Sequence, residues 1–309
     1  MAPLHPDMRI LTEAQKHAYT GTTIQEQREA WGRYTASIAE PPPASMAVRD
    51  ELLPATHPPA GHRVKVRIYT HARPSGACVI YMHGGGFMKG DLDSSDPIAW
   101  GFCDQTGATV VSVDYRLTPE HPYPAAFHDC LAVLRHLAAE AASLGIDPAR
   151  IGVAGDSAGG HLAASLCLAA RDGIAPPVRA QAVIYTVTGT DMTMPSYTEN
   201  ATGYGLTTTA CHEYYRILLP RPEHQSDPLA RPAIVENLAG LPPAFVHSAE
   251  FDPVRDDGRL YASRLALVGV DVTYREARGM IHGFMRARFK GAAARAEYDA
   301  ICDFLRERL

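Results

Sequence analysis

The chain has 309 residues, of which 46% are hydrophobic and 20% charged, and this length suits one large α/β domain or two small ones. Its formal net charge of −5 gives no reason to expect a nucleic-acid partner. The N-terminus lacks the pattern of a signal peptide and no stretch reaches the roughly eighteen apolar residues of a membrane span, so we expect a soluble, cytoplasmic protein.

The first fifty residues differ from the rest of the chain. Residues 22–39 predict a helix with large apolar side chains near one face, and three prolines at 41–43 end it. A second proline-rich stretch, at 54–59, precedes the first clear strand. We interpret residues 1–50 as an appendage that packs on the main domain.

Strands and helices then alternate along the chain. Short runs rich in β-formers and bounded by turns predict strands at 64–70, 78–82, 108–113, 151–154, 183–185, 244–248 and 272–274. Apolar residues at helical spacing predict helices at 127–137, 158–170, 256–268 and 292–309. This alternation predicts a largely parallel sheet that is covered on both faces.

One interval, between residues 185 and 244, breaks this rhythm. It holds a loop at 186–205, one predicted helix at 209–219 and a stretch dotted with prolines. An insertion of this length usually carries a function or forms a cap.

The cysteines are spread widely, without a C-x-x-C pair. Most of them fall among apolar neighbours in predicted strands or helices. The pattern favours buried, reduced thiols over disulfides or a zinc site. They are Cys78, Cys103, Cys130, Cys167, Cys211 and Cys302.

The segment 155–159, Gly-Asp-Ser-Ala-Gly, fits the pattern G-x-S-x-G between a short apolar strand and a helix. A strand that turns into a helix within a few residues strains the backbone at the serine, and the flanking glycines remove Cβ atoms that would clash. The helix N-terminus points N–H groups toward developing negative charge. The pattern predicts Ser157 as a nucleophile, supported by Gly155, Asp156 and Gly159, although a chance turn of small residues fits the letters too.

The segment His83-Gly84-Gly85-Gly86-Phe87 follows the predicted strand at 78–82. Three glycines at a strand end let backbone N–H groups approach a substrate oxygen, as an acyl-transfer enzyme requires at its tetrahedral intermediate. A flexible glycine-rich turn is the alternative. We interpret His83 as a structural residue that holds this loop in shape with Gly86, rather than as a catalytic base.

An activated serine needs a histidine, and that histidine needs an orienting carboxylate. Where the serine lies in a G-x-S-x-G turn between a strand and a helix, the order along the chain is nucleophile, acid, base. His282 lies in a glycine-flanked loop after the last predicted strand, where a positioned base is expected. Asp252 comes just past the strand at 244–248, and Pro253 fixes the turn beyond it. Three rival acids stay open: Glu250, Asp256, which also fits as a helix cap, and Asp257.

Five segments together resemble the bacterial hormone-sensitive-lipase-like (family IV) carboxylesterases of the α/β-hydrolase superfamily. They are HGGGF (83–87), DYRLTPEHPYPAA (114–126), GDSAGG (155–160), EFDPVRDDG (250–258) and HGF (282–284). The resemblance implies an α/β-hydrolase fold, with a mostly parallel eight-stranded sheet, helices on both faces and a helical cap. It divides the chain into an N-terminal cap segment (1–50), a catalytic domain in two parts (51–185 and 241–309) and a cap insertion (186–240).

The resemblance also implies the chemistry. It assigns the triad to Ser157, Asp252 and His282, and the oxyanion donors to the N–H groups of Gly84, Gly85 and Ala158. It implies hydrolysis of a small-molecule ester without a metal or an organic cofactor, and a homodimer formed through a sheet edge near Val272. The chain departs from the family at Thr186, where we expect a proline, and in a cap helix that is poor in Trp and Phe.

We therefore expect a serine carboxylesterase that hydrolyses short-acyl esters through an acyl-enzyme. An amidase, formamidase or deacetylase would use the same triad, so sequence does not separate these activities. A non-catalytic binding protein on this scaffold would lack a triad position. A third alternative makes Asp156 the nucleophile, but the middle position of the motif is the serine.

Overall fold

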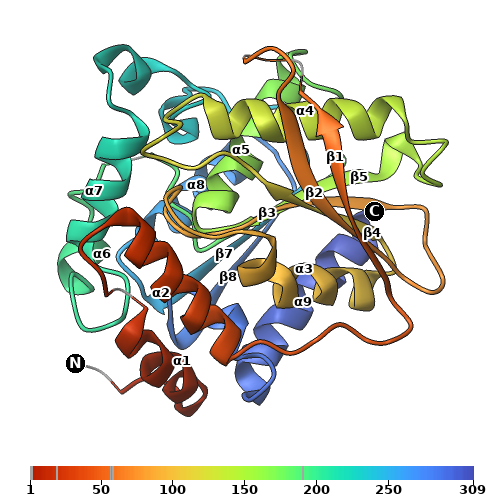
Figure 1. Cartoon of the computed structure of the whole chain (residues 1–309). Coiled ribbons are helices and arrows are strands. Elements are labelled where there is room, and N and C mark those ends of the chain that lie inside the picture. The colour runs from red at the N-terminus through yellow and green to blue at the C-terminus, as the bar shows by residue number, and fades with distance from the viewer. Residues whose placement is uncertain (1–2, 19, 56, 58, 190) are drawn as a thin grey trace.

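Eight strands in the described residues of the computed structural model, which are 3–18, 20–55, 57, 59–189 and 191–309, form one sheet in the order β1-β2-β4-β3-β5-β6-β7-β8 (Figure 1). The strands are β1 (Ala47–Pro54), β2 (Arg63–Thr70), β3 (Cys78–Met82), β4 (Thr109–Asp114), β5 (Ile151–Asp156), β6 (Gln181–Ile184), β7 (Ala244–Phe251) and β8 (Val272–Ile281). The β1–β2 and β2–β4 pairs are antiparallel, and the remaining pairs are parallel. The predicted mostly parallel, eight-stranded sheet is confirmed.

Helices cover both faces of this sheet and enclose two apolar cores (Figure 1). One core lies under α4 (Ala125–Ala139), α5 (Ala158–Arg171) and α8 (Arg255–Leu267). The other lies under α3 (Leu92–Thr106) and α9 (Ala292–Arg308). The central strands therefore have no solvent-facing side, which is why they consist of continuous apolar runs.

Strand β1 and helix α3 escaped the sequence analysis. Strand β1 lies at the sheet edge and carries exposed charged residues and a terminal proline, so its sequence looks like a loop. Helix α3 contains Pro97 and is buried over most of its circumference, so no apolar stripe marks it. It begins with a capping box in which Asp91 and Ser94 bond each other's backbone N–H.

The N-terminal segment and the insertion after β6 supply the remaining helices. The former holds α1 (Arg9–Ala14) and α2 (Ile24–Ser37), which starts at a capping box between Thr23 and Glu26. The latter holds α7 (Thr208–Leu218) and a short helix, α6 (Pro195–Glu199), in the stretch expected to be loop. Single 3-10 turns complete the chain: η1 (Pro6–Met8), η2 (Gln15–His17), η3 (Pro148–Arg150), η4 (Pro222–Ser226), η5 (Pro232–Ile234) and η6 (Phe284–Ala287).

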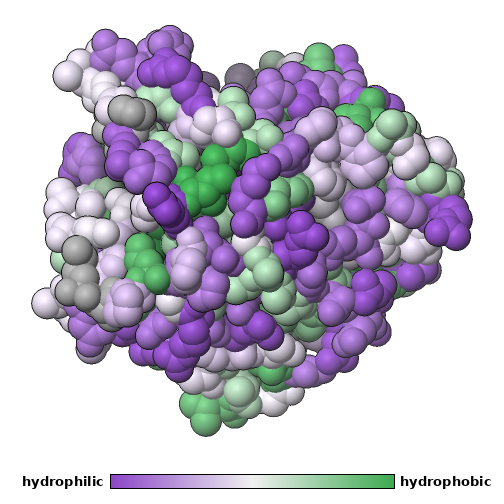
Figure 2. All heavy atoms as spheres, turned by 90° about the horizontal axis from the view of Figure 1, so that it is seen from below, coloured by the Kyte–Doolittle hydropathy of each residue, from purple (hydrophilic) through white to green (hydrophobic). Residues whose placement is uncertain are grey.

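All six cysteines are free and buried, as predicted. The face seen from below in Figure 1 is mostly hydrophilic, with hydrophobic side chains in small separate groups (Figure 2). Among the described residues, every helix is too short or too polar to cross a bilayer. Strand β8 forms one edge of the sheet, and a homodimer through it stays a prediction.

A buried ion pair joins the end of β4 to α4. The Arg116 guanidinium donates to both carboxylate oxygens of Asp129, at 2.8 and 2.9 Å, and the Arg116 backbone N–H donates to the same carboxylate at 2.9 Å. Asp129 is fully buried and also lies 3.1 Å from the His62 ring nitrogen. One carboxylate thus fixes three segments of the chain.

We expect Asp129→Ala to lower the free energy of unfolding by about 3–5 kcal/mol, because it leaves a partly buried guanidinium without this carboxylate. Asp303→Ala is the matched control, since Asp303 pairs with Arg306 on the exposed surface of α9, and it should cost about 1 kcal/mol or less. Urea titrations followed by circular dichroism measure both values. Equal losses in the two variants would contradict this account.

Candidate active site

Ser157 occupies the turn between β5 and α5, with φ at 55° and ψ at −118°. This backbone conformation is strained for a residue with a side chain. A Cβ at Gly155 would lie 2.1 Å from the Gly159 carbonyl oxygen, and a Cβ at Gly159 would lie 1.8 Å from the Met82 oxygen. Only glycine fits at either position, so the turn can bring Ser157 to the end of the sheet.

His282 and Asp252 reach Ser157 from the ends of two other strands. His282 directly follows β8, and its Nε2 lies 2.8 Å from the Ser157 Oγ. Its Nδ1 lies 2.7 Å from Asp252 Oδ2, just past β7. Asp252 is fully buried, and its second oxygen accepts the Val254 N–H at 3.1 Å. Parallel strands end at one edge, which brings these three distant residues into one hydrogen-bonded chain.

The three rival acids have partners elsewhere. Each is held by a contact that leads away from His282: Glu250 accepts the Gly279 N–H at 2.7 Å, Asp256 pairs with Arg255 at 3.0 Å, and Asp257 accepts the Tyr197 hydroxyl at 2.7 Å. Of the four carboxylates considered, Asp252 is the one that contacts the imidazole.

Residues 83–87, here called the glycine loop, lie beside Ser157. His83 is fully buried, its Nδ1 lies 2.9 Å from the Gly84 carbonyl oxygen, and its ring stacks on Tyr115 at 4.3 Å. The Tyr115 hydroxyl donates to the His83 carbonyl at 2.6 Å. These contacts agree with a structural role for His83 in shaping the loop.

Asp156 ties the glycine loop to the sheet. Its carboxylate accepts the Tyr81 hydroxyl at 2.5 Å, the Gly84 N–H at 2.9 Å and the Tyr185 hydroxyl at 3.3 Å. This corrects the expectation for Gly84, because an N–H that already donates to a buried carboxylate is not directed at a substrate oxygen. Among the described residues, no acceptor takes the N–H of Gly85, Gly86 or Ala158.

The two residues after β6 contact the site, and the sequence analysis assigned neither a role there. Tyr185 adopts φ 33° and packs its ring 4.8 Å from the His282 ring. Thr186 donates its hydroxyl to the Ser157 carbonyl oxygen at 2.6 Å, which braces the strained turn. The one sequence feature that could have drawn attention to this position is that the chain has Thr186 where the family resemblance leads us to expect a proline.

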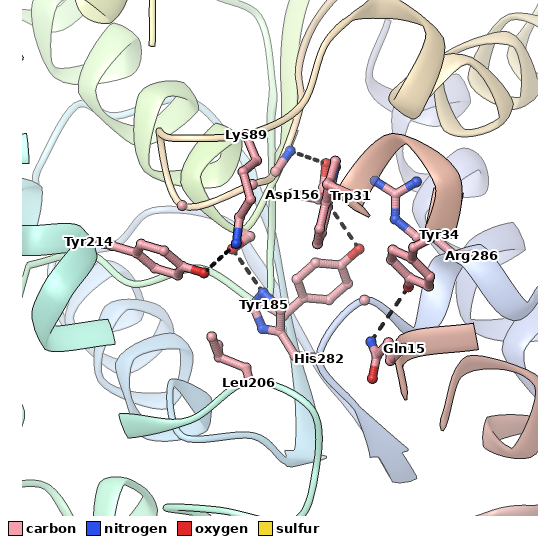
Figure 3. A pocket seen from close by; sticks show the side chains of 15 residues that line it. Gln15, Trp31, Tyr34, Lys89, Asp156, Tyr185, Leu206, Tyr214, His282 and Arg286 are labelled. Carbon is pink, nitrogen blue, oxygen red and sulfur yellow. Dashed lines mark hydrogen bonds between the residues drawn. The ribbon is translucent and has the colours of Figure 1, made fainter. Parts of the chain in front are cut away.

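Two hollows meet at Ser157 and His282. One, here called the polar pocket, encloses about 450 Å³ and is drawn in Figure 3. Its other walls include Gln15, Trp31, Tyr34, Lys89, Tyr214 and Arg286. The second, here called the apolar pocket, encloses about 340 Å³, and its walls include Phe87, Val187, Leu206, Cys211, Tyr215 and Val254. The N-terminal segment and the insertion therefore both contribute walls.

Comparison with known proteins identifies the family of the chain. Residues 79–286 match the sequence profile of a family described as alpha/beta hydrolase fold. The chain is 42% identical to the carboxylesterase NlhH of Mycobacterium tuberculosis over 227 residues, which are 72% of this chain and 71% of that protein. It is 37% identical to an ethyl acetate hydrolase of Pseudomonas putida over 232 residues, 73% of each chain.

Solved structures of esterases superpose closely on all or nearly all of the chain. A thermostable esterase from Pseudomonas putida gives a TM-score of 0.91 at 27% identity, covering 100% of this chain and 98% of that one. The carboxylesterase EstE1, cloned from a metagenomic library, gives 0.86 at 34% identity and covers 93% and 98%. The family profile, the relatives and the fold agree that this chain is a carboxylic ester hydrolase and belongs to the hormone-sensitive-lipase-like branch of the α/β-hydrolase family.

Proposed function

We propose that the chain is a serine carboxylesterase in which Ser157, His282 and Asp252 form the catalytic triad and an acyl-enzyme is the intermediate. The observation that carries this proposal is the unbroken hydrogen-bonded chain from the Ser157 hydroxyl through the imidazole to the Asp252 carboxylate, at 2.8 and 2.7 Å. Nucleophile, base and orienting acid need this order of contacts.

In the first half-reaction, His282 accepts the hydroxyl proton as the Ser157 oxygen attacks the ester carbonyl carbon. The buried Asp252 holds the other ring nitrogen in its protonated tautomer and stabilises the imidazolium that forms. The tetrahedral intermediate collapses when His282 gives its proton to the leaving alcohol, and the acyl group stays on Ser157. Water then attacks the acyl-enzyme, with His282 again as the base, and releases the acid.

The oxyanion of each tetrahedral intermediate binds, in this proposal, to the N–H groups of Gly85, Gly86 and Ala158. Gly86 replaces Gly84 in this set because the Gly84 N–H donates to Asp156. Ala158 contributes as the first residue of α5, where the N–H groups lack acceptors within the helix and the helix dipole favours negative charge.

Short-acyl esters suit this site best. The apolar pocket has a volume of only about 340 Å³ and is lined in part by side chains of the insertion, and two relatives are named for small esters, an ethyl acetate hydrolase and an acetyl esterase. We propose that the residues before β1, which begins at Ala47, and residues 186–240 form the cap, so the N-terminal cap segment is a few residues shorter than the expected 1–50. Trp31 and Tyr34 of the first segment and Leu206 and Tyr214 of the second line the polar pocket.

Ser157→Ala should reduce kcat/KM for para-nitrophenyl acetate by about a million-fold, because the nucleophile and its base act as one unit. The same substitution should abolish covalent labelling by an organophosphate, which mass spectrometry of the intact chain detects. Turnover near the wild-type rate by this variant would end the proposal.

Asp252→Asn should lower kcat by about 10⁴-fold, because an amide favours the wrong imidazole tautomer. Asp256→Asn is the matched control: this neighbouring carboxylate pairs with Arg255 rather than His282, and we expect its kcat to stay within a few-fold of the wild type. Comparable losses in both variants would argue against Asp252 as the triad acid.

Across a series of para-nitrophenyl esters, kcat/KM should peak at acetate or butyrate and fall for laurate and palmitate, because a long chain has no room in the apolar pocket. Steady-state rates below each ester's solubility limit measure this. A maximum at palmitate would contradict the proposed substrate size.

A further inference from the structure

Lys89 places an ammonium group inside the active site. It follows the glycine loop by two residues, the whole residue is only 3% exposed, and it lines the polar pocket with Ser157 and His282. Figure 3 shows its ammonium pointing into the pocket, between Tyr214 and His282. Its Nζ donates to the Tyr214 hydroxyl at 3.0 Å and lies 5.6 Å from the centre of the Trp31 ring.

Burial of this ammonium is costly, because lysine is rarely enclosed and its charged form is the better hydrated. Burial lowers the pKa of Lys89 to about 8, so the group is still mostly charged at neutral pH. A bound anion would favour the charged form and offset the desolvation. The side chain is therefore better suited to meeting a ligand than to filling space.

The other charged residues that line the polar pocket also favour an anionic ligand. Arg286 is buried in its wall, and the guanidinium carbon lies 5.6 Å from the same Trp31 ring. The wall also contains the Asp156 carboxylate, which accepts bonds from Gly84 and two tyrosines. Among the described residues, the lining of the polar pocket thus holds two cations and one carboxylate, although the Arg286 guanidinium itself donates to the Ser94 carbonyl oxygen. The described walls of the apolar pocket carry no Lys, Arg, Asp or Glu.

We propose that Lys89 is a specificity residue that binds a carboxylate on the substrate, so that the preferred substrates are esters with a free carboxylate on the part that occupies the polar pocket. This inference rests on the proposed function and narrows its substrate class. The ammonium donates to the carboxylate, Tyr214 holds the lysine in place, and the uncharged part of the ester lies in the apolar pocket.

A purely structural role makes a different prediction. The Lys89–Tyr214 bond also connects the loop after the glycines to α7 of the insertion. If that were its whole purpose, its loss would slow the hydrolysis of charged and neutral esters alike. The ratio of kcat/KM between a charged ester and its neutral counterpart therefore separates the two roles.

The test compares wild type, Lys89→Met and Lys65→Met. Methionine keeps the apolar stem of lysine without its charge. Lys65 pairs with Asp50 at 3.2 Å, is 47% exposed and lies outside both pockets, so Lys65→Met controls for the change in net charge. Two substrate pairs are used: mono-para-nitrophenyl glutarate with para-nitrophenyl pentanoate, and meta-acetoxybenzoate with its methyl ester.

The first pair carries the carboxylate on the acyl part and the second on the alcohol part. We expect Lys89→Met to lower the charged-to-neutral ratio by about 10- to 100-fold in one pair, the size of one charge-assisted hydrogen bond, and Lys65→Met to leave both ratios as in wild type. The affected pair identifies which part of the ester enters the polar pocket. Unchanged ratios in both pairs, or equal losses on charged and neutral esters, overturn the proposal.

A measurement on the wild type alone keeps the proposal testable if Lys89→Met fails to fold. Glutaramate, which carries one carboxylate, should compete with para-nitrophenyl acetate more strongly than the neutral glutaramide does, or meta-hydroxybenzoate more strongly than phenol. No preference in either comparison overturns the proposal. Ser157→Ala separates the two hypotheses. Full activity in Ser157→Ala refutes the proposed function. If Ser157→Ala is inactive but Lys89→Met keeps the charge selectivity of the wild type, only the role of Lys89 is refuted.

Discussion

The strained turn at Ser157 is the constraint on which the rest of the site depends. A positive φ at a residue with a side chain persists only where its surroundings hold it. Here the backbone of Gly159 packs directly against the end of β3, where no Cβ fits, and Thr186 bonds the Ser157 carbonyl. Ser157, the glycine loop and the residues after β6 therefore form one packed unit, which Asp156 strengthens through its bonds to Gly84 and two tyrosines.

Much of this arrangement could be predicted from the sequence, since the relevant signals are local. Continuous apolar runs marked the central strands, and the order of nucleophile, acid and base selected Ser157, Asp252 and His282 from many candidates. Edge strand β1 and helix α3 escaped because the first is exposed and polar and the second is buried on nearly all sides. Neither presents the periodicity that a half-buried element has.

Contacts across the fold were beyond the sequence. Three consecutive glycines do not indicate which of their N–H groups bonds to Asp156, which lies seventy-two residues after Gly84. Gly84 was therefore assigned to the oxyanion site, although its N–H donates to the Asp156 carboxylate. Lys89 gave no signal either, because a lysine in a loop is most often a solvated charge. Its burial follows from α2 and α7, whose side chains Trp31 and Tyr214 lie against it.

Reactive groups and pocket walls come from different parts of the chain. The serine, histidine and aspartate are attached to the ends of β5, β8 and β7, whereas α2 and the insertion supply most of the large side chains that a substrate would meet. Substitutions in α2 or α7 can therefore reshape what the protein accepts while its reactive centre stays intact. Such a division lets one scaffold diversify quickly, and it makes these two helices the natural targets for redesign toward new esters.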